Sequence, residues 1–114
     1  MEGVAVEEYE TGAEPPVCPN CGAPLRPDVV WFGEMLPSGA MEAASAAARG
    51  CDLFLSIGTS GLVYPAAGLP REALAHGATV AEVNPDETPL SADARHALRG
   101  RAGGILPALV DALR

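Results

Sequence analysis

The sequence contains no lysine, and all seven of its basic residues are arginine. A lysine Schiff base is therefore excluded as a reaction mechanism, and the chain cannot itself carry an acylated lysine. Its 15 acidic residues outnumber the arginines and give a formal net charge of −8. Because binding to nucleic acid requires clustered basic side chains, this balance argues against a nucleic-acid partner.

Cysteines and long apolar runs are also scarce. Three cysteines do not make the disulfide framework of a small secreted protein, so we expect a reducing compartment, the cytoplasm. No apolar run approaches the roughly 18 residues that a membrane span requires. The start of the chain is acidic, whereas a secretory or mitochondrial presequence would be basic. We therefore expect no membrane partner.

What the sequence does contain indicates one compact domain or part of one. Hydrophobic residues make up 48% of the 114 residues, and the mean hydropathy is +0.16. Residues 1–16 differ from the rest because they carry five glutamates and no base, and they end in two prolines. We interpret them as an exposed acidic lead-in, with an acidic interaction tail as the functional alternative.

The most informative stretch begins at Leu53–Ile57, a short apolar run typical of a parallel strand buried on both faces. Gly58, Thr59 and Ser60 follow it and combine a flexible backbone with hydroxyl and N–H groups. Ligands of open α/β sheets bind beyond the carboxyl ends of the strands. The turn therefore predicts a nucleotide site, although a tight turn without a ligand explains the same residues.

The remaining pattern alternates helices with strands and predicts an α/β fold with a parallel sheet. Asn84 ends the second strand, where its side chain is placed to meet a ribose hydroxyl, although Asn-Pro is also a strong turn dipeptide on its own. The expected elements are helices at 35–50, 66–76 and 105–113, strands at 79–83 and 95–99, a loop at 88–94 and a glycine-rich turn at 100–104.

Cys18 and Cys21 form a Cys-x-x-Cys pair followed by Gly22, as in a zinc knuckle. Two thiolates at this spacing can reach one tetrahedral ion, but structural zinc requires four ligands. Neither Cys51 nor the two histidines is well placed to complete the set. A redox pair is the rival interpretation, and it is disfavoured because Pro24 and Pro27 exclude the helix that such a pair normally begins.

Residues 25–34 are rich in β-branched and aromatic side chains and predict a strand that Gly33 ends. Val30, Trp31 and Phe32 fit an ordinary core equally well. The functional interpretation is a strand edge that pairs with an extended peptide, because such an edge offers free backbone groups.

Five motifs occur together in one order and resemble the C-terminal half of a sirtuin, in the bacterial, class III-like branch of these NAD-dependent protein lysine deacylases. The motifs are CPNCG, RPDVVWFGE, IGTSGLVYPAA, the strand ending in Asn84-Pro85, and RGRAGGILP. The resemblance covers Val17 to the C-terminus. It implies an acyl-lysine protein substrate, NAD as cofactor and a structural zinc ion.

The resemblance also implies residue roles. Gly58, Thr59, Ser60, Asn84 and Ala102 match NAD-contacting positions, Cys18 and Cys21 match zinc ligands, and Val30, Trp31, Phe32 and Gly33 match the substrate-peptide strand. It divides the chain into the lead-in, a partial zinc-ribbon module and substrate strand at 17–34, and the C-terminal half of a Rossmann-like domain at 35–114.

Other parts of the sirtuin pattern find no match in these residues, namely the phosphate loop, the histidine general base and the first cysteine pair. We therefore expect a C-terminal fragment that is inactive alone. We also expect it to self-associate through the apolar surface that the other half of the domain would cover. Two alternatives stay open, a non-catalytic module that binds NAD or ADP-ribose and a structural zinc-binding interaction domain.

Overall fold

A computed structural model describes residues 15–114, which fall into two units, one that ends at Leu36 and one that spans Pro37–Arg114. The acidic lead-in predicted for residues 1–16 lies, except for its last two residues, outside the described part. Within residues 15–114 no helix is long and apolar enough to cross a bilayer.

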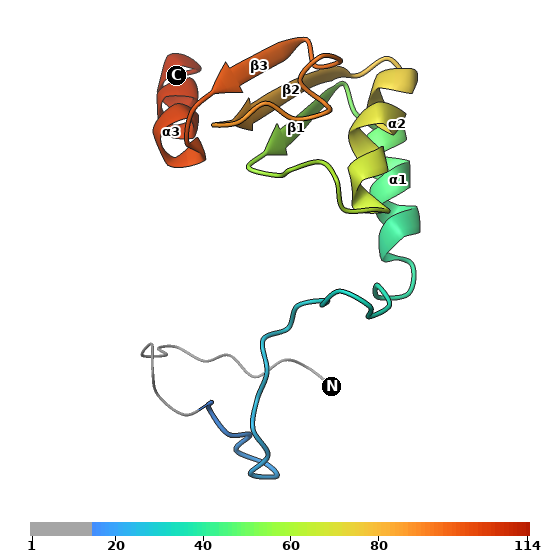
Figure 1. The fold of residues 1–114 in the computed structure, drawn as a ribbon, viewed down its shortest axis with the longest axis vertical. Helices are drawn as coiled ribbons and strands as arrows, with labels where there is room; N and C mark the ends of the chain where they lie inside the picture. Colours follow the sequence, from blue (N-terminus) through green and yellow to red (C-terminus); the bar gives the residue numbers. More distant parts are fainter. Residues whose placement is uncertain (1–14) are drawn as a thin grey trace. The chain divides into compact units, whose positions relative to one another are not determined.

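The unit Pro37–Arg114 is built on a sheet of three parallel strands in the order β1-β2-β3 (Figure 1). The strands are β1 (Leu53–Ile57), β2 (Thr79–Asn84) and β3 (His96–Arg99). Leu53 lies opposite Thr79, and Ala81 lies opposite His96. The prediction of an α/β fold with parallel strands is therefore confirmed.

The helices of this unit are α1 (Ala40–Gly50), the 3-10 turn η1 (Ala66–Gly68), α2 (Leu69–Ala75) and α3 (Ala102–Ala112). In α1, Glu42 lies in the first turn and Arg49 in the last, where each charge complements the helix dipole. Pro70 lies in the first turn of α2, where a missing N–H costs nothing. Helices α1 and α2 pack against each other, and α3 lies apart from them (Figure 1).

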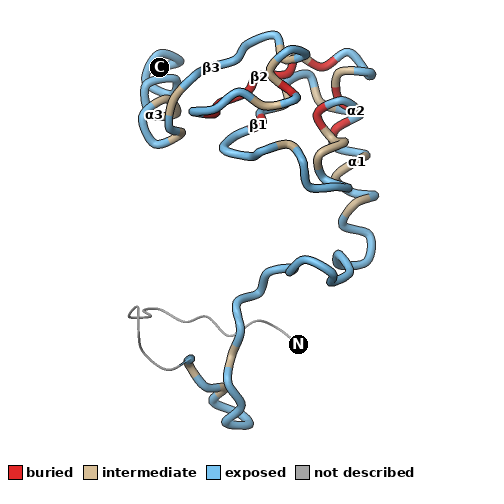
Figure 2. Tube along the Cα trace, in the orientation of Figure 1, coloured by how far each residue is buried: buried red, intermediate tan, exposed pale blue. Residues whose placement is uncertain are grey.

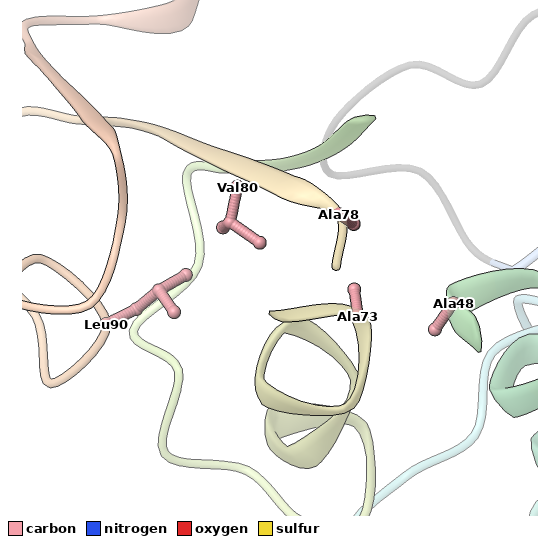
Figure 3. Packing of buried hydrophobic residues seen from close by; sticks show 5 residues of the cluster. All are labelled: Ala48, Ala73, Ala78, Val80 and Leu90. Carbon is pink, nitrogen blue, oxygen red and sulfur yellow. The ribbon is translucent and has the colours of Figure 1, made fainter. Parts of the chain in front are cut away.

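The core is small and lies where α2 meets β2 (Figure 2). Ala73 of α2 and Val80 of β2 are completely buried. In Figure 3, Val80 and Leu90 point toward α2, and Ala73 lies on the side of this helix that faces the strand. Alanine on the contact face lets the helix approach the sheet closely, and Ala48 and Ala78 extend the cluster.

Strand β1 departs from the prediction of burial on both faces. Phe54 and Ser56 point toward the covered side, whereas Leu53, Leu55 and Ile57 are 55%, 44% and 39% exposed. The reason is that this second face of β1 is left without sufficient cover by residues 37–114. The central strand β2 is the one that is buried.

Two further predictions were wrong. The glycine-rich turn at 100–104 is only partly a turn, because α3 begins at Ala102 and includes Gly103 and Gly104. Residues 25–34 contain no strand, because a strand requires a neighbour for its backbone groups. Within residues 15–36 the only strand-like pairing is the single bridge between Val17 and Pro24.

Candidate nucleotide-binding site

The turn after β1 begins with a glycine that the backbone requires. Gly58 has a φ of 64°, in the left-handed region that favours glycine, and its N–H donates to the Val83 carbonyl at 2.9 Å. Three residues further on, the Gly61 N–H donates to the Thr59 hydroxyl at 3.2 Å. The chain therefore leaves β1 sharply at the carboxyl edge of the sheet, beside the end of β2.

Asn84 joins the turns that follow β1 and β2. Its Nδ2 donates to the Thr59 carbonyl at 2.8 Å, and its Oδ1 accepts the Asp86 N–H at 3.1 Å. The side chain is 7% exposed, so it acts first as a link inside the protein. One amide hydrogen and one oxygen lone pair remain for a ligand. Its predicted contact with a ribose hydroxyl stays a prediction.

A cavity of about 440 Å³ opens at this edge of the sheet. Four of the five residues predicted to bind the cofactor line it, namely Gly58, Ser60, Asn84 and Ala102. Thr59 does not. It lines a second, more apolar cavity of about 290 Å³ beside β1. The turns after β1 and β2 and the start of α3 thus meet at one cavity, as the pattern of strand ends predicted.

Sequence reasoning missed five residues of the cavity lining, which are Pro85, Asp86, Glu87, Thr88 and Arg101. The signal that could have found most of them was their position directly after a parallel strand. Carboxylates at such a site suit ribose hydroxyls, and a guanidinium suits a phosphate. Asp86, Glu87 and Arg101 therefore give the cavity both kinds of group that a nucleotide requires.

The unit that ends at Leu36 holds the cysteine pair in a tight turn. The Cys18 N–H donates to the Ala23 carbonyl and the Gly22 N–H to the Cys18 carbonyl, both at 2.8 Å. Backbone N–H groups of Asn20 and Cys21 point at the Cys18 sulfur and lower the pKa of this thiol. Among residues 15–114 no group of three or more metal-binding side chains is present. The turn fits two of the four ligands of a zinc site.

A second local structure shapes the residues predicted to contact substrate. Arg26 forms a forked ion pair with Glu34, at 2.8 and 3.1 Å, and its guanidinium lies 4.2 Å above the Trp31 ring. The Trp31 N–H also donates to Glu34, and these bonds lower the pKa of Glu34 to about 2. Val30, Trp31 and Phe32 are 43%, 54% and 91% exposed. Their pairing with a peptide, and that of Gly33, stays a prediction.

Together, the parallel sheet and its flanking helices define the class, an α/β protein with a partial Rossmann-like fold and a cavity at the carboxyl edge of its sheet. The profile of the Sir2 family matches residues 1–65, more than half of the chain. The chain belongs to the Sir2 family.

Two bacterial relatives are similar over most of the chain. The NAD-dependent protein deacylase of Methylococcus capsulatus is 56% identical over 110 residues, which are 95% of this chain and 43% of the relative. NAD-dependent protein deacylase 1 of Pseudomonas aeruginosa is 55% identical over 97 residues, 85% of this chain and 39% of the relative. The chain thus spans less than half the length of the relatives it matches.

Solved structures of Sir2 proteins have the same fold. A Sir2 homologue in complex with NAD is 42% identical, with a TM-score of 0.80 over 97% of this chain and 43% of the other. Sir2Tm bound to a propionylated peptide is 30% identical, with a TM-score of 0.72 over 88% of this chain and 42% of the other. The predicted resemblance to bacterial sirtuins is confirmed.

Proposed function

We propose that this chain supplies the nucleotide-binding part of an NAD-dependent protein lysine deacylase. The observation that carries the proposal is the cavity at the carboxyl edge of the sheet, where predicted cofactor residues from three separate segments meet. The NAD complex of a similar Sir2 homologue and the names of the bacterial relatives support it. Bound NAD would supply the ADP-ribosyl group that accepts the acyl group from lysine.

Each part of the cavity has a role in this proposal. The glycine at 58 lets a phosphate approach the backbone, and the Ser60 hydroxyl and Arg101 guanidinium are available to it. Asn84 and Asp86 would hold ribose hydroxyls, and the first turn of α3 at Ala102 would contact the adenine side. Thr59 would act indirectly, through the bond that its carbonyl accepts from Asn84.

The substrate in this proposal is an acyl-lysine protein. Two similar Sir2 structures contain peptides, one of them propionylated and the other a p53 peptide. We assign the peptide-facing backbone to Val30, Trp31, Phe32 and Gly33, because these residues are exposed and lie in no strand of their own. The ion pair between Arg26 and Glu34 would hold this segment in shape before a peptide arrives.

Cys18 and Cys21 would give two of the four thiolates of a structural zinc site. The tight turn and the lowered pKa of Cys18 both favour the deprotonated sulfur that zinc binds. Metal analysis of the purified chain tests this. One zinc per two chains, together with a dimer, would indicate a site shared between copies, and one zinc held tightly by a monomer would contradict a site with only two ligands in this chain.

An activity assay with a matched binding assay tests the proposed function. We expect the purified 114-residue chain to bind NAD but to release no acyl group from an acetyl-lysine or succinyl-lysine peptide. General bases and phosphate-binding groups each contribute orders of magnitude to a rate, and no residue here matches the family's histidine base or phosphate loop. The N-terminal part of the Methylococcus capsulatus relative, added in trans, should restore turnover.

A non-catalytic NAD-binding or ADP-ribose-binding module is the second candidate. It is favoured by the fact that the cavity is formed entirely by residues 58–102. The same assays separate the two functions, because nucleotide binding that never leads to turnover, with or without the added part, would support the module. Absence of nucleotide binding would contradict both.

A further inference from the structure

A buried carboxylate lies next to the segment Asp86–Thr88, which lines the candidate nucleotide site and which we call its rim. Glu82 is in the middle of β2, is 1% exposed and does not line the cavity. Its oxygens accept hydrogen bonds from the Thr88 hydroxyl, from the Ser91 hydroxyl at 2.6 Å and from Arg99 Nη1 at 2.9 Å. All three donors thus come from the segment after β2 or from β3.

The same three side chains also hold backbone groups of the rim. Arg99 Nη1 donates to the Asp86 carbonyl at 3.0 Å, and the Ser91 Oγ accepts the Thr88 N–H at 2.8 Å. Arg99 Nη2 donates to the Ser91 Oγ at 2.7 Å, and the Leu90 N–H donates to the Thr88 hydroxyl oxygen at 3.1 Å. Asp86 and Thr88 line the cavity. One carboxylate therefore restrains the rim through three intermediaries.

The hydrogen bonds fix the charge state of this carboxylate. Burial alone would raise the pKa of Glu82, but the bonds from Ser91, Thr88 and Arg99 outweigh it and lower the pKa. Both hydroxyls donate to Glu82 and accept from backbone N–H groups, so all donors and acceptors match only when Glu82 is ionised.

Stability alone does not explain such an arrangement. Glu82 is 1% exposed and has lost its water, whereas the Arg99 side chain is 38% exposed, and an ion pair that includes a buried charge is often no more stabilising than apolar side chains of similar volume. What it does supply is one defined geometry, since each partner has a required direction. Here that geometry is imposed on Asp86 and Thr88, in the segment that follows Asn84 and Pro85.

We propose that Glu82 and Arg99 are positioning residues, which with Ser91 hold the rim at Asp86 and Thr88 in its nucleotide-binding form before the ligand arrives. The assignment rests on the proposed nucleotide site. Neither Glu82 nor Arg99 lines the cavity, so both act through the rim and not by touching the ligand.

The test compares Glu82→Gln and Ser91→Ala with a matched control, Glu72→Gln. Glu72 is also an ion-paired carboxylate, bonded to Ser45 and Arg49, but it joins α1 to α2 and does not line the cavity. ADP-ribose is titrated by calorimetry into the 114-residue chain at a temperature where thermal unfolding shows each variant to be folded. Hydrogen exchange of the Thr88 and Leu90 amides is measured without ligand.

We expect Glu82→Gln to weaken ADP-ribose binding about tenfold, the lower end of the loss seen when a residue that orients a metal ligand is removed. Ser91→Ala, a smaller change that keeps Glu82, should weaken binding in the same direction, whereas Glu72→Gln should bind like the wild type. The Thr88 and Leu90 amides should exchange faster with solvent in Glu82→Gln and Ser91→Ala than in the wild type.

Unchanged affinity in Glu82→Gln and Ser91→Ala would overturn the proposal, as would an equal loss in Glu72→Gln. If even the wild type does not bind ADP-ribose, the proposed nucleotide function fails separately. The exchange measurement still decides whether Glu82 restrains the rim, because unchanged exchange at Thr88 and Leu90 in Glu82→Gln excludes it.

Discussion

Each of the two units of this chain is stabilised by a different kind of interaction. In Pro37–Arg114 a helix packs on a sheet, and Val80 and Ala73 have no exposed surface. In residues 15–36 most of the large apolar side chains stay exposed, as at Phe32 with 91%, and the local structure includes one cysteine turn and one forked ion pair. Hydrophobic burial therefore stabilises the first unit, and local hydrogen bonds shape the second.

The largest difference in stability should be found between substitutions of one buried and one exposed valine. Val80→Asp places an unpaired charge in the core, whereas Val30→Asp changes a side chain that is 43% exposed. An unpaired buried charge costs about 4 kcal/mol or more, close to the whole stability of a domain of this size. We expect Val80→Asp to abolish cooperative thermal unfolding measured by circular dichroism.

Val30→Asp should leave the melting temperature within about 3 °C of the wild type, the range of ordinary surface substitutions. A comparable loss of stability in both variants would show that residues 15–36 belong to the same cooperative core, which would contradict the difference between the two units.

The bare face of β1 should matter for association more than for folding. Leu53, Leu55 and Ile57 present an apolar stripe at the edge of the sheet, and an edge strand also offers unpaired backbone groups. We expect the chain to self-associate in sedimentation experiments and Leu55→Glu to weaken this association about tenfold, or about 1.4 kcal/mol. A Val30→Glu control places the same charge on the other unit. If Leu55→Glu associates like the wild type, the stripe is not the contact.

Acid should destabilise each unit through a different carboxylate, Glu82 in Pro37–Arg114 and Glu34 in residues 15–36. The pKa values of Glu82 and Glu34 both lie below the ordinary value of 4.5, so the unfolded form of each carboxyl binds protons more readily. The stabilisation that each contributes is complete above about pH 4.5 and is lost as the pH falls through its folded pKa. For Glu34 that loss extends down to about pH 2.

The chain offers a separate probe for each unit, because its single tryptophan is Trp31. Glu82→Gln should flatten the acid dependence of the melting temperature measured by circular dichroism. Glu34→Gln should leave that dependence unchanged but remove the acid-induced change in Trp31 fluorescence. Identical pH profiles for the two variants by both probes would contradict separate units.

The smallest effect is expected at the cysteine turn. Two thiolates hold zinc far less tightly than four, so Cys18→Ser should change the free energy of unfolding by less than about 0.5 kcal/mol, with or without chelator. A Cys51→Ser variant provides the control. A large chelator-dependent shift in the wild type, in a protein that sedimentation shows to be monomeric, would refute an incomplete site.

Much of the fold was predictable because its signals are local. The apolar runs before Gly58 and Asn84 predicted two parallel strands, and the residues at their carboxyl ends proved to line one cavity. The exposed face of β1 was not predictable, since an apolar run shows that burial is favoured but not what is available to cover it. The missing strand at 25–34 has the same cause, because pairing depends on a neighbour that a local pattern does not contain.

The network at Glu82 was also invisible in the sequence. Its four side chains come from positions 82, 88, 91 and 99, and this spacing is neither helical nor alternating. A glutamate in a strand is usually interpreted as solvent-exposed, and its burial here depends on donors from Ser91, Thr88 and, on the neighbouring strand, Arg99. The same holds for Arg101, which the fold brings from the start of α3 to the cavity beside Asp86.

The most direct test of the account is an NMR titration of the ¹⁵N-labelled 114-residue chain with ADP-ribose. We predict saturable amide shifts confined to the cavity, at Gly58, Ser60, Asn84, Asp86 and Ala102, and none at Cys18–Glu34. Shifts spread evenly over both units, or no saturable shift at any cavity residue, would contradict the claim that the nucleotide site lies at the carboxyl edge of the sheet.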